Sequence, residues 1–311
     1  MKIFYAADIH AAESTFRKFT NAGPFYKADL VIYGGDFCGK MVVPIIKTSK
    51  GWEATYYGST VSLKDERELP DLKKTLRDAG FYWVEMTEAE LEAVTAEDVE
   101  RITKECRLAQ VKEWVKLMDE RFKKNKLSCV IIPGNGDPYY IDEILNQVQN
   151  VQNGDGKVVR INNLEILSLG FGHKTMFKFP RDIEEDEMTR KIDELASTVK
   201  DMKRCIFNIH VPPYDTDLDQ DTLYDEDLNP ILDGDSLATG AVGSKAVRQA
   251  IEKYQPLLGL FGHVHASRGI SRIGNTICVN PGSNYDETQL RGVLIELDST
   301  GKINPPTLTS G

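Results

Sequence analysis

Seven side chains that can bind metal ions stand directly after apolar segments of this sequence. They are Asp8 and His10 in Asp8-Ile9-His10, Asp36 in Gly34-Gly35-Asp36, Asn135 in Gly134-Asn135, the single His210, and His263 and His265 in Gly262-His263-Val264-His265. Imidazole, carboxylate and amide groups together suit Mn, Fe, Zn, Ni or Mg. Seven such side chains are enough for a centre that holds two divalent metal ions.

The apolar segments before these motifs have the composition of buried strands. We expect strands near residues 2–7, 30–34, 129–133, 164–169, 204–210, 257–262, 276–280 and 292–297, and helices near 13–22, 142–147, 186–199 and 244–254, the last with Ser244 as its N-cap. Asn162-Asn163 and Gly274-Asn275 are typical hairpin turns. Loops that leave the C-terminal ends of strands carry the ligands of α/β proteins, because the sheet fixes these ends side by side. The pattern indicates an α/β sandwich with some antiparallel pairing.

Composition limits the partners of the protein. The chain has 311 residues, a net charge of −10 and five scattered cysteines without a C-x-x-C pair. Acidic proteins bind duplex nucleic acid poorly, since that binding depends on Lys and Arg, so duplex nucleic acid is not an expected partner. No segment has the length and apolarity of a membrane span or the pattern of a signal peptide, and we expect a cytoplasmic protein with reduced thiols.

Residues 50–126 interrupt the alternation of expected strands and helices. We expect a mainly helical, cap-like insertion there, with a hairpin near 52–63 and a long helix over 96–125. Thr87 and Thr95 each precede an acidic residue by three positions, as in a helix-start capping box. An extra packing layer without a part in catalysis is an equally weighted alternative. Residues 299–311 are expected to form a mobile tail.

The order of the five motifs, D-x-H, G-D, G-N, H and G-H-x-H, resembles that of the calcineurin-like metallophosphoesterase superfamily. The resemblance covers residues 1–298 apart from the insertion, and the stretches 208–213 and 279–283 are similar to those of its Icc-like branch. It implies a hydrolase with a four-layer α/β/β/α sandwich, in which the ligand loops of both sheets meet around the metals.

The resemblance also implies the role of each ligand. One ion would be held by Asp8, His10 and His265, the other by Asn135, His210 and His263, with Asp36 as the bridge between them. Two such ions lower the pKa of a shared water to about 7, and the resulting bridging hydroxide attacks phosphorus. Mn is the expected metal, with Fe, Zn, Ni and Mg as alternatives.

One position departs from the family pattern. Many members have a histidine directly after the asparagine of the third motif, where this chain has Gly136. A lost general acid costs about 10²–10⁴ in rate, which favours phosphodiesters of acidic alcohols or phosphoanhydrides over alkyl monoesters. His173, in a loop after the expected strand 164–169, or its neighbour Lys174, is a hypothetical contact for the substrate or leaving group. A solvated loop histidine is the alternative.

Three functions follow from these observations. The favoured one is a phosphodiesterase that acts on a small phosphorylated molecule, with a nucleotide among the candidates. A nuclease of the same fold would need a basic surface, and a non-enzymatic metal-binding scaffold would not need all seven ligands. The sequence leaves open whether the protein forms a homo-oligomer.

Overall fold

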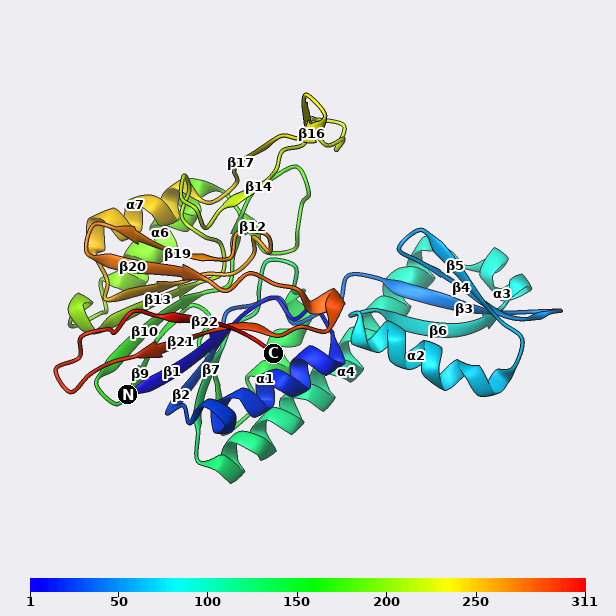
Figure 1. Cartoon of the computed structure of the whole chain (residues 1–311), viewed down its shortest axis with the longest axis horizontal. Helices are drawn as coiled ribbons and strands as arrows, with labels where there is room; N and C mark the ends of the chain where they lie inside the picture. The colour runs from blue at the N-terminus through cyan, green and yellow to red at the C-terminus, as the bar shows by residue number, and fades with distance from the viewer.

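Two six-stranded sheets stacked face to face form the body of the protein in a computed structural model of residues 1–311 (Figure 1). Sheet 1 has the order β22-β21-β1-β2-β7-β8, with β1 Lys2–Ala6, β2 Leu30–Tyr33, β7 Ser128–Ile131, β8 Val151–Asn153, β21 Arg291–Glu296 and β22 Thr307–Ser310. Sheet 2 has the order β19-β20-β18-β13-β10-β9, with β9 Lys157–Ile161, β10 Leu164–Leu169, β13 Cys205–Ile209, β18 Leu258–Leu260, β19 Gly269–Ile273 and β20 Thr276–Asn280. All eight strands expected from the sequence are therefore confirmed.

Parallel pairing brings the ends of the ligand-bearing strands to one edge. In sheet 1, β1, β2 and β7 are parallel neighbours, with Ile3 level with Leu30 and Leu30 level with Ser128. In sheet 2, β13 and β18 are parallel neighbours, with Ile206 level with Leu258. Antiparallel strands pair only toward the edges, where β21 and β22 extend sheet 1 and β9 and β19 border sheet 2.

Helices cover the outer face of each sheet, which completes four layers. On β1, Ile3 and Tyr5 face sheet 2, whereas Phe4 and Ala6 face the helices, as the strand period of two requires. The helices α1 Glu13–Tyr26, α4 Ala96–Asn125 and α5 Asp142–Leu145 cover sheet 1, and α6 Glu185–Ala196 and α7 Lys245–Tyr254 cover sheet 2. The structure thus confirms the expected α/β/β/α sandwich. None of its helices combines the length and the apolar character that crossing a lipid bilayer requires.

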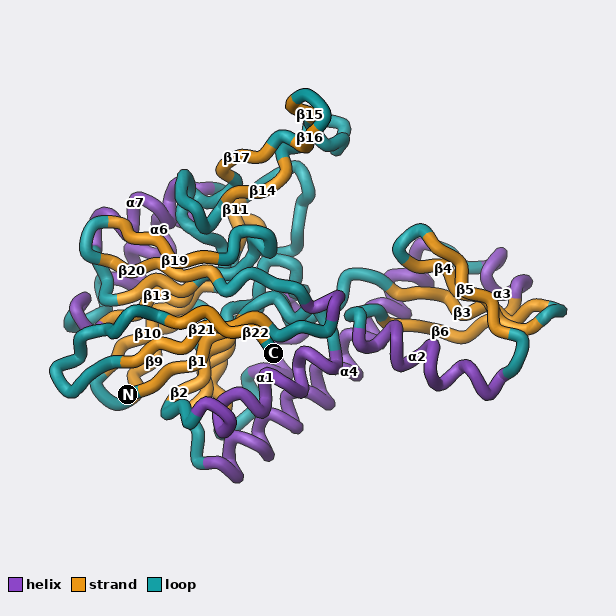
Figure 2. Tube along the Cα trace, in the orientation of Figure 1, coloured by secondary structure: helices purple, strands orange, loops and turns teal.

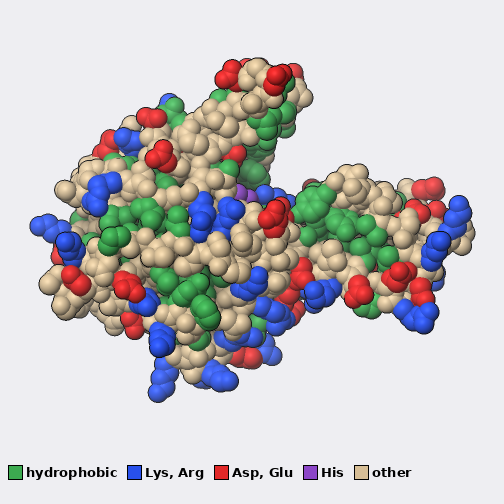
Figure 3. Space-filling model, viewed as in Figure 1, with side chains coloured by type: hydrophobic (Ala, Val, Ile, Leu, Met, Phe, Trp, Pro, Cys, Tyr) green, Lys and Arg blue, Asp and Glu red, His purple; other side chains and the backbone are tan.

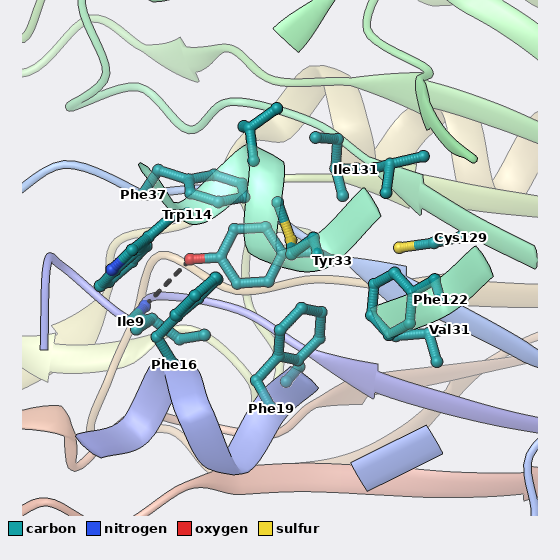
Figure 4. Close-up of a cluster of buried hydrophobic side chains, with 14 of the residues drawn as sticks. Ile9, Phe16, Phe19, Val31, Tyr33, Phe37, Trp114, Phe122, Cys129 and Ile131 are labelled. Carbon is teal, nitrogen blue, oxygen red and sulfur yellow. Dashed lines mark hydrogen bonds between the residues drawn. The ribbon is translucent and has the colours of Figure 1, made fainter. Parts of the chain in front are cut away.

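The core under α1 and α4 (Figure 4) includes Ile9 and Phe37, which are sequence neighbours of candidate ligands. The rings of Phe16 and Trp114 stack with centroids 3.8 Å apart, which fixes α4 against α1. The hydroxyl of Tyr33, at the end of β2, accepts the N–H of Ile9 at 3.1 Å and donates to the carbonyl of Asp36 at 2.8 Å. A core side chain therefore links the loop after β1 to the loop after β2.

The insertion differs from the expected one in its bounds and its architecture. Residues 41–95 project from the body as an α/β unit, which we call the inserted subdomain (Figures 1 and 2). Its sheet has the order β5-β4-β3-β6, from β3 Val42–Thr48, β4 Gly51–Tyr56, β5 Ser59–Leu63 and β6 Tyr82–Thr87, and its helices are α2 Leu69–Asp78 and α3 Glu88–Ala93. The range 50–126 was wrong because the second half of α4 belongs to the body, where Trp114 and Phe122 are buried. The expected hairpin and both capping boxes are confirmed.

The expected mobile tail was also wrong, because β22 pairs with β21 and the half-buried Leu308 packs on the core between the sheets.

Residues 214–243 form a second projection, which we call the arm; it contains β14 Gln220–Thr222, β15 Leu232–Asp233, β16 Ser236–Leu237 and β17 Thr239–Ala241. The pair β11 Gly172–His173 and β12 Asp182–Ile183 lies near its base. The turns at Asn162 and Gly274, with φ of 53° and 58°, and the Ser244 cap are confirmed.

Candidate metal centre

The seven expected ligands come together where the strand ends of both sheets meet. Four of them follow strands of sheet 1: Asp8 and His10 after β1, Asp36 after β2, and Asn135 after β7. Three follow strands of sheet 2: His210 after β13, and His263 and His265 after β18. The first five named are buried, and the last two are half-buried.

One group of ligand atoms gathers around His10. The Nε2 atoms of His10 and His265 lie 3.0 Å apart, and Oδ1 of Asp8 lies 3.8 Å from Nε2 of His265. Oδ2 of Asp36 lies 3.4 Å from Nε2 of His10. Asp8, His10 and His265 thus offer three ligand atoms within 4.8 Å of one another.

A second group gathers around Asn135. Its Oδ1 lies 3.1 Å from both Nε2 of His210 and Nδ1 of His263. The other carboxylate oxygen of Asp36, Oδ1, lies 3.7 Å from Nε2 of His210. Asp36 therefore directs one oxygen toward each group.

Hydrogen bonds on the far side of the ligands orient their metal-binding atoms. Nδ1 of His210 faces the carbonyl of Gly34 at 2.8 Å and donates a proton to it, which directs Nε2 of the ring toward Asn135. Nδ2 of Asn135 donates to Asp182 at 2.9 Å, which turns Oδ1 toward the two histidines. The donor set therefore fits metal ions.

The pKa shifts in the cluster also fit bound metal ions. Burial, followed by the charge of Lys40, lowers the pKa of His10 and lowers that of His265 to about 3; burial and the neighbouring His210 lower the pKa of His263. These three imidazoles are neutral and free to coordinate. Burial also lowers the pKa of His210, but Asp36 and Asp8 outweigh that effect and leave it raised.

The pKa of Asp8 shifts in the direction opposite to that of these three histidines. Burial, opposed by His210 and reinforced by the charge of Asp36, raises the pKa of Asp8 to about 7. A buried carboxylate that resists ionisation is stabilised in its charged form by a bound cation.

Four ligands have a backbone conformation that residues other than glycine seldom adopt. The φ angles are 57° at Asp8, 45° at His10, 58° at Asp36 and 67° at His263. Such strain costs about 1–3 kcal/mol per residue and collects at functional sites, where the surrounding structure enforces it. The sharp turns bring the side chains back over the strand ends.

Three residues outside the predicted set hold the ligand loops. Asp137, two residues after Asn135, accepts three buried N–H groups from the loops after β2 and β7. Asp182 orients Asn135, and Tyr33 joins the loops of Asp8 and Asp36. Sequence reasoning missed the roles of Tyr33 and Asp182, because one resembles a core strand residue and the other lies 47 residues from its partner.

Gly136 stands against the carboxylate of Asp36. Its N–H donates to Oδ1 of Asp36 at 3.0 Å, and a Cβ at this position would lie 3.2 Å from the same oxygen. A side chain here would press on the carboxylate of Asp36. At position 136 the chain therefore offers a backbone N–H group and no titratable side chain.

A cavity of about 820 Å³ opens beside the ligands, and Figure 3 shows histidine atoms where the body, the arm and the inserted subdomain meet. Lys40 and Arg107 line it together with ligands from both groups and bring positive charge to its wall. His173 also lines the cavity, with Nδ1 buried and without a partner. Lys174 does not line the cavity and pairs instead with Glu184 on the surface.

Comparisons with known proteins agree with this architecture. No family model matches the chain. Over 157 residues, it is 34% identical to the uncharacterized protein MJ1162 of Methanocaldococcus jannaschii, a match that spans 50% of this chain and 64% of that relative, less than two thirds of its length.

Two crystal structures superpose on almost the whole chain. That of TT1561 from Thermus thermophilus covers 100% of this chain and 97% of its own, with a TM-score of 0.54 and 14% identity. Another covers 99% of this chain and 98% of its own, with a TM-score of 0.57 and 16% identity. At these identities the two likenesses show a shared overall architecture.

Proposed function

We propose that this protein is a metal-dependent phosphoesterase with a centre of two divalent ions. One observation carries the proposal: the two oxygens of Asp36 face two separate groups of ligand atoms, 3.4 Å and 3.7 Å from a histidine nitrogen of each. The first ion would be held by Asp8, His10 and His265, the second by Asn135, His210 and His263, and both by Asp36. Mn²⁺ is the first metal to test.

Bound ions would lower the pKa of water and offset charge on the phosphoryl oxygens. The chain's own residues prepare the site for such chemistry. Gly34 and Asp182 fix the orientations of His210 and Asn135, and the enclosing strand ends exclude solvent from Asp8. Lys40 and Arg107 add positive charge, which attracts an anionic substrate to a chain whose net charge is −10.

The substrate we infer has a good leaving group. Gly136 provides no acid, and Lys40 is the exposed cation of the cavity that can balance charge on a departing oxygen. Phosphodiesters of acidic alcohols and phosphoanhydrides fit this site better than alkyl monoesters. His173 is a further candidate contact for the substrate, because its unpartnered Nδ1 lies at the cavity wall. Unchanged turnover of every substrate by His173→Ala would remove that role.

The test is a hydrolysis panel of bis(p-nitrophenyl) phosphate and p-nitrophenyl phosphate with Mn²⁺, Ni²⁺, Fe²⁺ and Mg²⁺. We expect hydrolysis with at least one metal, a preference for the diester, and loss of activity in Asp36→Asn. Asp186→Asn makes the same change at an exposed position of α6 and should leave activity intact. Absence of hydrolysis with every metal would favour a non-enzymatic metal-binding scaffold.

A further inference from the structure

Three aromatic side chains line the same cavity as the candidate metal ligands. Phe177 and Phe179 come from the loop between β11 and β12, and Tyr224 comes from the arm. We call these three residues the aromatic wall. The rings of Phe177 and Tyr224 meet edge to face, with centroids 5.4 Å apart and an interplanar angle of 86°. The arm and the loop thus build one surface from two distant parts of the chain.

The aromatic wall is open to the cavity instead of being packed into the core. The exposed fraction is 45% for Phe177, 37% for Phe179 and 38% for Tyr224. Large apolar side chains left open in a concave site are typical of a surface that a ligand covers. Phe177 and Phe179 do not stack face to face, since their ring centroids lie 6.3 Å apart with an interplanar angle of 31°, so ring surface stays available for stacking on a ligand.

Hydrogen bonds tie the loop of the aromatic wall to the candidate metal centre. The N–H of Phe179 donates to Oδ2 of Asp182 at 3.0 Å, and Oδ1 of the same carboxylate accepts Nδ2 of Asn135 at 2.9 Å. The N–H of Arg181 donates to the carbonyl of Asn135 at 3.1 Å, and its buried guanidinium donates to the carbonyl of Asp137 at 2.7 Å. The base of the loop is therefore fixed against the residues that would hold a phosphate.

The size and charge of the cavity limit its ligand. A volume of about 820 Å³ is typical of sites for whole organic molecules, and a phosphate alone would leave most of it empty. Positive charge comes from Lys40 and Arg107, whereas the arm lines the cavity with uncharged Thr222 and Leu223 and the single acid Asp221. The ligand therefore carries an anionic group and a large group without negative charge.

We propose that the aromatic wall stacks on a planar ring of the substrate, a nucleobase, and makes the enzyme selective for nucleotide phosphoesters. This proposal rests on the proposed function, because the phosphate would be held by the metal centre in the same cavity. Aromatic side chains stack on every base, since each base has a π face. The enzyme should therefore discriminate between substrates with and without a base more than it discriminates among bases.

The test compares the binding of AMP and of ribose 5-phosphate to the Mn²⁺-loaded full chain by calorimetry. Both ligands carry the same sugar phosphate, so the ratio of their dissociation constants isolates the contribution of the base. We expect AMP to bind about 5- to 150-fold more tightly. Phe177→Leu, which keeps an apolar side chain but removes the ring, should reduce this ratio several-fold, and Phe177→Tyr should preserve it.

A matched control is Phe25→Leu, the same change at a 76% exposed ring on α1, which should leave the ratio unchanged. A ratio near one in the wild type, or an unchanged ratio in Phe177→Leu, would overturn the proposal even if p-nitrophenyl esters are hydrolysed. A high ratio that Phe177→Leu reduces would support nucleotide binding even if hydrolysis fails, which would refute only the proposed function. A shift in oligomeric state on Phe177→Leu, with the ratio unchanged, would assign the aromatic wall to self-association and overturn the proposal.

Discussion

Asp137 is the residue whose replacement tests most directly how the candidate metal centre is held together. Its carboxylate is fully buried, and it accepts the N–H groups of Phe37 at 2.9 Å, Cys38 at 2.7 Å and Gly134 at 2.9 Å. Two of these donors share Oδ2, and the third points at Oδ1. Asn at this position would keep one oxygen acceptor and turn an N–H₂ group toward the remaining donor.

The expected change in the free energy of unfolding follows from those three hydrogen bonds. A hydrogen bond to a charged acceptor contributes about 1.5–3 kcal/mol, and a buried donor left without a partner costs about 1–3 kcal/mol. Burial, followed by the charge of Asp36, raises the pKa of Asp137, so removal of the charge offsets part of the loss. We expect Asp137→Asn to lower the free energy of unfolding by about 2–4 kcal/mol and to weaken metal binding.

The assay is urea denaturation of the metal-free protein, with Mn²⁺ affinity measured separately by calorimetry. Asp298→Asn is the control, because Asp298 also accepts backbone N–H groups but is exposed, so water replaces the lost bond. An unfolding free energy within about 1 kcal/mol of wild type, together with unchanged Mn²⁺ affinity, would refute the reasoning.

Other perturbations probe the same structure. Asp182→Ala frees the amide of Asn135 and should cost about 10–100-fold in metal affinity or activity, as a Mn²⁺ titration would reveal; equal affinity would show that Asn135 needs no orienting partner. Mn²⁺ at about 100 times its dissociation constant should raise the free energy of unfolding by about 2.7 kcal/mol for one site, and a melting temperature insensitive to Mn²⁺ would argue against a resident metal. Burial opposes ionisation of Glu165, but the N–H groups of residues 200 and 201 and the guanidinium of Arg160 lower its pKa overall. The stability advantage of wild type over Glu165→Gln is therefore complete above about pH 4.3 and should shrink as the pH falls below it; a constant difference down to about pH 3 would contradict this account.

The strands that carry the ligands could be predicted because both faces of each sheet are covered. A strand such as β2 or β13 is buried along its whole length and appears as an unbroken apolar segment. The strands of the inserted subdomain are half-exposed, so polar and apolar residues mix and the periodicity is weak, as in β5. The long helix α4 hid the boundary, since it begins directly after the inserted subdomain and only its second half packs into the core of the body.

The residues of the candidate site also fall into those that could be predicted from the sequence and those that could not. The proximity of all seven candidate ligands could be predicted, because each belongs to a short motif at a strand end. Asp182 and Tyr33 could not, since their roles depend on tertiary contacts: β12 brings Asp182 to Asn135, and the hydroxyl of Tyr33 bridges two loops. The aromatic wall has no motif either, and only the folding of the arm beside the β11–β12 loop brings Tyr224 to Phe177.

The division of the ligands between the sheets has a mechanical consequence. Sheet 1 is built from residues 2–153 and 291–310, and sheet 2 from residues 157–280. The interface between them is largely apolar, and such contacts are non-directional. Metal ions that coordinate Asp36 on one sheet and His210 on the other would act as a cross-link, so that the two halves of the sandwich open as one cooperative unit. Amide hydrogen exchange in β2 and β13 should then slow together when metal binds.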